Sequence, residues 1–123
     1  MITRMTATFL FAAALAVICA CGGSKVTRLG KAIPKETTVT TAQAINAAPV
    51  DFEGRTVLVK GKITRECPAG CWFWIQDQTG EMYVDIKPSC LVIPQRVGST
   101  ITVVGTVVLE SGHPHIIGSG LEL

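Results

Sequence analysis

From residue 55 to the last residue, apolar and polar side chains alternate with a period of two, which is typical of β-strands with one buried face. Segments rich in glycine, proline or polar residues divide this pattern into five predicted strands. Gly61 and Gly105 lie inside the first and fourth strands and indicate sharp bends, as at the corners of a small barrel. The predicted strands cover residues 57–64, 72–77, 81–87, 100–110 and 115–123.

A short helix is predicted before the strands, over residues 41–48. Thr41 is a favourable N-cap, the next residues support about two turns, and Pro49 ends the pattern. The connection over residues 88–98 separates the third strand from the fourth, and such an interruption among five antiparallel strands is the layout of an OB-fold. We therefore predict a mainly β protein, a small five-stranded antiparallel OB-fold barrel with a short N-terminal helix. A small sandwich or an SH3-like barrel is the alternative.

The alternation also assigns each side chain to a face of the barrel. The outer face is predicted to carry aromatic rings on the second and third strands and two lysines on the first. OB-folds bind oligonucleotides and oligosaccharides on this face. The alternative is that the helix or the 88–98 connection covers the rings, which would then not be a binding surface. The predicted core is Val59, Phe73, Ile75, Val84, Val103 and Val107, and the predicted binding face is Trp72, Trp74, Tyr83, Lys60 and Lys62.

The N-terminus has the pattern of an export signal. Arg4 precedes an uncharged run over residues 9–19, which is shorter than the roughly 20 residues needed to span a bilayer. The run ends in residues 18–21 (ICAC), which resemble the lipobox of bacterial lipoproteins: a branched apolar residue, a variable one, a small one and then Cys. This resemblance implies cleavage after Ala20 and a lipid, with palmitate, on Cys21. An ordinary signal peptide or an uncleaved membrane anchor is the alternative.

The predicted organisation follows from this signal. Residues 1–20 are the signal peptide, residues 21–40 the lipidated Cys21 with a flexible tether, and residues 41–123 an OB-fold-like domain. The predicted location is the cell envelope, lipid-anchored to a membrane outside the cytoplasm, at the outer membrane or the periplasmic face.

Charge and motifs then limit the function. Without Arg4, ten Lys or Arg residues accompany nine Asp or Glu residues, a net charge of +1, which is not the footprint of a nucleic-acid-binding protein. The predicted partners are the membrane, through the lipid, and an unidentified protein, peptide or glycan. No G-x-S-x-G elbow or glycine-rich phosphate loop is present, so we predict no enzymatic activity. The carboxylates near the central hairpin, Glu66, Asp77, Glu81 and Asp85, are interpreted as a solvated face.

Of the five cysteines, Cys19 would leave with the signal peptide and Cys21 would be lipidated, so three remain: Cys67, Cys71 and Cys90. Outside the cytoplasm, disulfides between such cysteines persist. One interpretation is a structural disulfide across the 67–71 loop, with Cys90 buried or replacing one loop cysteine. A second is a zinc or copper site that joins Cys67 and Cys71 to His113 and His115 through neighbouring loops; the cofactor is not identified by the sequence, and a metal ion is a candidate. A third is a thiol oxidoreductase, although its usual motif has two residues between the cysteines and starts a helix.

Three stretches carry a family resemblance: FEGRTVLVKGKI, CPAGCWFWIQDQTG and IPQRVGSTITVVGTV. Through them, residues 41–123 resemble the extracytoplasmic bacterial OB-fold proteins, which are often lipoproteins and often labelled nucleic-acid-binding-like. The resemblance implies a fold, and the family has no settled activity or catalytic residue to transfer. We predict a membrane-anchored cell-envelope lipoprotein with a non-enzymatic OB-fold binding or structural module. The alternatives are a metal- or haem-handling periplasmic protein and a thiol oxidoreductase.

Overall fold

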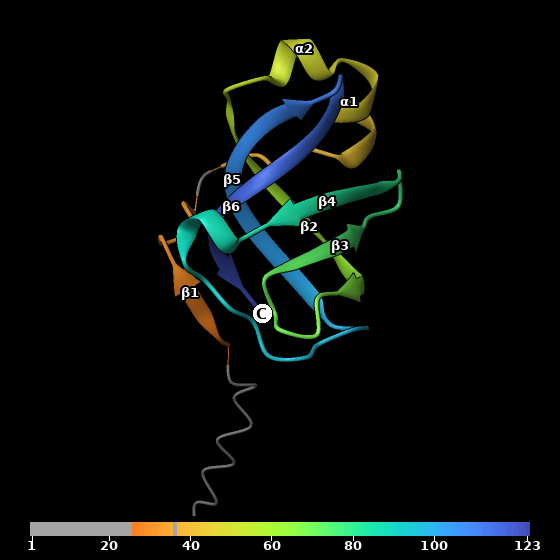
Figure 1. Cartoon of the computed structure of the whole chain (residues 1–123). Helices are drawn as coiled ribbons and strands as arrows, with labels where there is room; N and C mark the ends of the chain where they lie inside the picture. The colour runs from red at the N-terminus through yellow and green to blue at the C-terminus, as the bar shows by residue number, and fades with distance from the viewer. Residues whose placement is uncertain (1–25, 36) are drawn as a thin grey trace, which may run out of the picture.

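The structure is a computed structural model that describes residues 26–35 and 37–123 (Figure 1). The predicted signal peptide and the lipidation site at Cys21 lie outside the described residues. Within the described ranges, no helix is both long enough and apolar enough to cross a membrane. The elements are β1 (Arg28–Gly30), α1 (Ala42–Ala47), α2 (Pro49–Phe52), β2 (Thr56–Glu66), β3 (Trp72–Gln76), β4 (Glu81–Asp85), the 3-10 turn η1 (Lys87–Ser89), β5 (Thr100–Glu110) and β6 (His113–Glu122).

All five predicted strands are present, and they correspond to β2 through β6. The predicted bounds of the fourth strand are those of β5, whereas β4 ends at Asp85, two residues early, and β6 begins at His113, two residues early. The predicted helix is α1, and the side chain of its N-cap, Thr41, accepts a hydrogen bond from the N–H of Ala44 at 3.2 Å. The period-two pattern and the capping residue therefore located the elements correctly.

The strands close into a barrel, and β5 is the wall strand that joins its two halves (Figure 1). Strand β5 pairs antiparallel with β2 on one side and with β6 on the other, and the β2–β3 and β3–β4 hairpins continue the sheet. A short parallel pairing of β4 with β6 completes the circle. At Gly105, where the β5–β6 register shifts, a Cβ atom would lie 2.4 Å from the carbonyl oxygen of Ile117, so only glycine permits this approach. The predicted fold class, a small five-stranded OB-fold barrel, is confirmed.

The barrel interior is apolar and fully enclosed. All six side chains predicted for the core are buried, with at most 3% of their surface exposed. Ile45 of α1 and Ile93 of the 88–98 connection join the same cluster of buried residues. Helix α1 lies over one end of the barrel and contacts β4 and β6 (Figure 1). The alternation along the strands therefore predicted the facing of the core correctly.

The N-terminal segment lies on the barrel earlier in the chain than the sequence indicated. Part of the range predicted to be a flexible tether forms β1, which pairs with β6 from Arg28 opposite Glu122 to Gly30 opposite Gly120. Leu29 packs against the core cluster, and Val39 forms a parallel bridge with Leu58 of β2. A strand of three residues is too short to produce a recognisable period, so the sequence pattern did not reveal it.

Asp77 links the β3–β4 turn to the start of α1. One carboxylate oxygen accepts the N–H groups of Thr79 (2.7 Å) and Gly80 (3.0 Å), and the other accepts the N–H of Ala42 (2.8 Å). Partial burial opposes ionisation of Asp77, but hydrogen bonds from the Thr79 hydroxyl and from these three amides more than offset it and lower the pKa of the carboxyl group. The interpretation of Asp77 as part of a solvated face is therefore wrong, because its oxygens are hydrogen-bonded within the fold.

The facing of β3 can be tested by paired truncations. Phe73 is 0% exposed, so we expect Phe73→Ala to lower the free energy of unfolding by about 3–5 kcal/mol, through lost transfer energy and a residual cavity. Its neighbour Trp74 faces outward and is half-buried, so Trp74→Ala should cost less. Urea denaturation followed by circular dichroism measures both values. A larger loss at Trp74 than at Phe73 would contradict the assigned facing.

The link at Asp77 should appear in the acid stability of the protein. The carboxyl group has a lower pKa folded than unfolded, so its contribution is present above the unfolded pKa and is lost as the pH falls through the folded pKa. We expect Asp77→Asn to lower the free energy of unfolding at pH 7 by about 1–2 kcal/mol, as for a lost helix cap, and to flatten its decline below about pH 4. Thermal unfolding between pH 2 and 7 measures both, with the exposed Glu53→Gln as the control. An unchanged acid profile in Asp77→Asn would contradict the role of Asp77.

Candidate functional site

The outer surface of β3, β4 and the adjoining β6 carries a cluster of rings, here called the aromatic face: Trp72, Trp74, Tyr83 and His115. Trp74 and Tyr83 are direct partners in the antiparallel register, and their ring centroids lie 5.4 Å apart in an edge-to-face arrangement. The ring of Tyr83 also lies 5.9 Å from that of Trp72 and 5.9 Å from that of His115 on β6. All four rings are half-buried. Trp72, Trp74 and Tyr83 lie together on the outside of the barrel, as predicted. Neither α1 nor the 88–98 connection buries them.

Arg65 of β2 belongs to the same surface, and the sequence pattern missed it. Strict alternation would place Arg65 on the inner face with Ile63, but a bulge between these two residues turns Arg65 outward. Its guanidinium carbon lies 4.7 Å from the centroid of the Trp74 ring, within the range of a cation–π interaction, and its guanidinium group lies 3.6 Å from the carboxylate of Glu81. The signal that would have found it is its charge, since arginine is almost never fully buried without a partner.

The two lysines predicted for the binding face are exposed on β2 and lie in different surroundings. Lys62 is the register partner of Gln76 at the end of β3, and Lys60 is the partner of Thr102 on β5. Lys60 instead lines a separate open groove of about 690 Å³ beside the N-terminal segment, together with Arg28, Lys31 and Lys35. The structure therefore places Lys60 in a basic groove that is separate from the aromatic face, and leaves Lys62 beside the end of β3.

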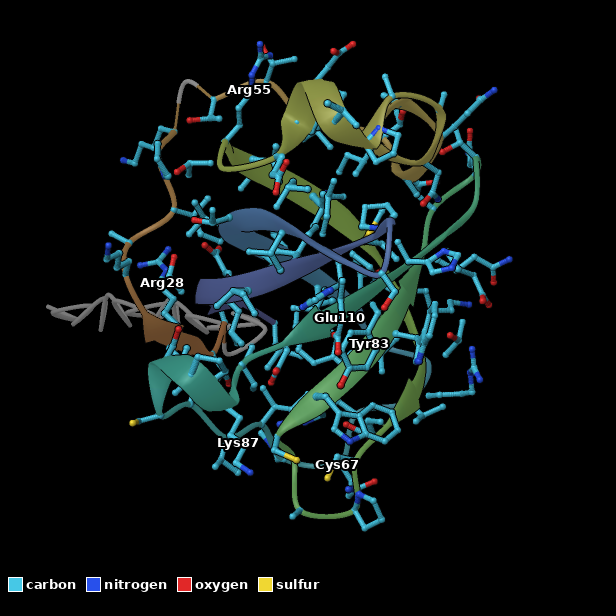
Figure 2. All side chains as sticks on the ribbon, turned by 45° about the horizontal axis from the view of Figure 1, so that its top comes forward. Arg28, Arg55, Cys67, Tyr83, Lys87 and Glu110 are labelled. Atoms are coloured by element: carbon cyan, nitrogen blue, oxygen red, sulfur yellow. The ribbon has the colours of Figure 1, made fainter. Side chains whose placement is uncertain are left out.

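Tyr83 lies at the centre of the aromatic face. Partial burial raises the pKa of Tyr83 above its ordinary value, and the charge of Asp85 raises it further. The phenol is therefore a protonated hydrogen-bond donor at neutral pH. Figure 2 shows Tyr83 and Cys67 on the same side of the barrel, and the two thiols of the 67–71 loop are close enough to contribute to the same pKa shift.

Cys67 and Cys71 meet across the loop between β2 and β3. The Cys71 thiol donates a hydrogen bond to the Cys67 sulfur at 2.7 Å, a separation longer than the roughly 2.05 Å of a disulfide. The three cysteines in the part of the chain that the structure describes are free thiols, so the predicted disulfide is not formed here. Cys90 follows η1 in a left-handed conformation and is exposed, and the interpretation of Cys90 as buried is wrong.

The 88–98 connection holds this cysteine loop at several points. The side-chain amide of Gln95 donates to the carbonyls of Cys67 and Pro68, both at 3.1 Å. The N–H of Ile93 donates to the carbonyl of Gly70 at 3.0 Å. Gly70 has a φ of +76°, and a Cβ atom there would lie 2.2 Å from the Ile93 carbonyl oxygen, so glycine is required both by conformation and by space.

The two thiols are not equivalent. The thiol hydrogen bond from Cys71 and the backbone N–H of Cys71 lower the pKa of Cys67; burial opposes them, and the N–H groups of Ala69 and Gly70 add to the lowering. The interaction with Cys67, followed by burial, raises the pKa of Cys71. Cys67 is thus the thiol that ionises first, although it is the less accessible of the two, with 9% of its surface exposed.

The described structure does not bring the four predicted metal ligands, Cys67, Cys71, His113 and His115, together. Among residues 26–35 and 37–123, no group of three or more His, Cys, Asp or Glu side chains is placed to hold a metal ion. The β5–β6 turn consists of Ser111 and Gly112, so His113 and His115 belong to β6 itself and not to a loop that reaches the cysteines. His113 is paired with Glu110 and His115 with Val108, and the His115 ring contacts Tyr83.

Comparisons with known proteins support the fold. The chain is similar to the structure of the hypothetical protein ygiW from E. coli, with a TM-score of 0.55 and 18% identity, over 70% of this chain and 90% of that one. It is also similar to asparaginyl-tRNA synthetase from Pyrococcus horikoshii, solved with asparaginyl-adenylate, with a TM-score of 0.57 and 18% identity, over 70% of this chain and 22% of that one. No protein-family model matches the sequence, and no curated protein matches it significantly. At this identity the likeness shows the fold alone, a small barrel of the OB-fold class.

Proposed function

We propose that this protein is a cell-envelope lipoprotein whose OB-fold barrel is a binding module, with its ligand on the aromatic face and no catalytic role toward that ligand. The observation that carries the proposal is the half-exposed cluster of Trp72, Trp74 and Tyr83 with Arg65 stacked on its edge. OB-folds bind extended ligands on the surface of their second and third strands, which are β3 and β4 in this barrel. Aromatic rings contribute about 1–3 kcal/mol for each stacked base, and they form a rigid platform for other flat ligand surfaces as well.

The chemistry of this surface favours an oligosaccharide of the cell envelope. The net charge of +1 for residues 21–123 provides little attraction for a nucleic acid, and the basic groove lies apart from the rings. A sugar ring presents a C–H face that stacks on indole or phenol, and its hydroxyl groups match polar side chains at the rim. Arg65, Gln76, Glu81 and Asp85 supply these groups on the same outer surface.

Membrane anchoring is supported by the sequence of residues 18–21, and little chain separates them from the barrel. Six residue steps join Cys21 to Thr27, which is hydrogen-bonded to Leu123, and extended chain covers at most about 3.6 Å per residue, so a lipid on Cys21 would keep the barrel within about 22 Å of its attachment point. A binding surface held so near a membrane suits a ligand that is itself part of the envelope.

Ligand binding is tested with the chain from residue 21 onward, which includes all of the described residues and carries Cys21→Ser to prevent lipidation. Titration with peptidoglycan and lipopolysaccharide-core oligosaccharides, followed by tryptophan fluorescence and calorimetry, should give saturable binding. We expect Trp74→Ala to weaken binding at least tenfold, because one stacked ring is lost, and the control Lys60→Ala to leave it unchanged.

Three outcomes would contradict the proposed ligand class. Loss of binding in Lys60→Ala with Trp74→Ala unaffected would move the site to the basic groove. Tighter binding of single-stranded oligonucleotides, with strong salt dependence, would identify a nucleic-acid ligand instead. Binding of peptides but not of oligosaccharides would identify a peptide site.

The anchor is tested separately in bacterial cells. Mass spectrometry of the membrane fraction should find a lipid-modified N-terminal Cys21. Cys21→Ser should release the protein from the membrane, whereas the matched variant Cys19→Ser should leave it lipidated, because residue 19 occupies the variable position of the lipobox. An unmodified Cys21 in the membrane fraction would contradict the anchor.

A further inference from the structure

We propose that Cys67 and Cys71 form a reversible dithiol–disulfide couple, which exchanges electrons with the thiols or disulfide of a partner at the edge of the aromatic face. The proposal goes beyond ligand binding and does not depend on it. It rests on two thiols that hydrogen-bond to each other within a loop whose backbone is fixed from outside.

The fixed loop is what favours exchange. Gln95 and Ile93 bind the carbonyls of Cys67, Pro68 and Gly70, and the Glu66 carboxylate accepts the N–H of Val97 at 3.0 Å, so the connection and the loop are joined at both ends. The sulfur atoms are therefore held together in the reduced protein. Closing the bond requires little rearrangement, and opening it leaves the loop in place.

A purely structural role explains the pair less well. The segment that a Cys67–Cys71 bond would close is only five residues long, and the stabilisation from a disulfide grows with the length of the closed segment. The flanking backbone is already joined, since the N–H of Cys67 donates to the carbonyl of Trp72 at 2.9 Å and the N–H of Gly70 to the carbonyl of Cys67 at 2.8 Å. The fold is thus complete without the bond.

The different exposure of the two sulfurs gives the exchange a direction. In the oxidised protein, a partner thiolate reaches the half-exposed Cys71 and forms a new S–S bond with it. The Cys67–Cys71 bond breaks, and its electron pair leaves on Cys67, where backbone N–H groups of the loop stabilise the thiolate. A second partner thiolate attacks the partner sulfur of this mixed disulfide and releases Cys71, which takes up a proton. One protein disulfide is reduced, and two partner thiols become one disulfide; the reverse sequence oxidises the protein.

The couple is tested on the chain from residue 21 onward with Cys21→Ser. The protein is equilibrated in buffers of varied ratio of reduced to oxidised glutathione, then quenched with an alkylating agent and analysed by mass. We expect Cys67 and Cys71 to change state together, at a ratio within the glutathione range, and Cys90→Ser to leave that midpoint unchanged. A pair that stays oxidised in a large excess of reduced glutathione would be a structural disulfide, and a pair that never oxidises would be inert; either result overturns the proposal.

Single variants test the assigned roles. Cys67→Ser should accumulate a stable glutathione adduct on Cys71, because the resolving thiol is absent. In the Cys71→Ser variant, glutathione should add to Cys67 at least tenfold more slowly than it adds to Cys71 in Cys67→Ser, since Cys67 is buried. Equal rates in the two variants would overturn the assignment of Cys71 as the attacked sulfur. Gln95→Ala, checked for folding by circular dichroism, should shift the midpoint severalfold toward the reduced state by loosening the loop, and an unchanged midpoint would overturn the role of the fixed loop.

The source of the partner thiol is resolved by comparing glutathione with reduced thioredoxin as electron donors to the oxidised protein. Reduction that is faster with thioredoxin, at equal thiol concentration, identifies a protein partner, and faster reduction by glutathione identifies a small thiol. Oligosaccharide titrations of Cys67→Ser keep this test separate from the proposed ligand: that variant should bind as the parent does while exchange is lost.

Discussion

The closure of the barrel through β5 is the constraint on which the other features depend. This one strand carries the pairing to β2 along one edge and to β6 along the other, so it fixes the curvature of the whole sheet. Closure requires β6 to approach the β5 backbone at Gly105 more closely than any side chain would allow. Once the sheet is closed, each residue of β3 and β4 has only an inside and an outside, and the pleat alone separates Phe73 from its two tryptophan neighbours.

The candidate site arises where this regular pattern is interrupted. The bulge after Ile63 brings Arg65 onto the ring of Trp74, and the loop after β2 brings two thiols to the edge of the same surface. Arg65 and the two cysteines are not members of the core cluster, so their side chains can contact a ligand or a partner without disturbing it. The cysteine loop joins β2 to β3, and the aromatic face begins on β3 directly after it. The two features therefore lie next to each other.

The sequence predicted what depends on local periodicity and failed where distant segments meet. Alternating side chains were sufficient for five strands, the core and the outward rings. The link from Asp77 to α1 joins residues 35 positions apart, and the hold of Gln95 on the cysteine loop spans 28 positions, so no local pattern reveals either. The predicted metal ligands are not brought together for a related reason: the prediction required two loops to converge, whereas the histidines lie within β6 after a tight turn.

The two ends of the described chain meet on the barrel. Thr27 and Leu123 exchange two backbone hydrogen bonds, at 3.1 and 2.8 Å, and β1 continues this pairing along β6. A fold whose entry and exit points coincide is a natural insertion module, since a host loop could carry it without having its own ends forced apart. The same geometry means that anything fused after Leu123 would start beside Thr27, where the described chain first joins the barrel.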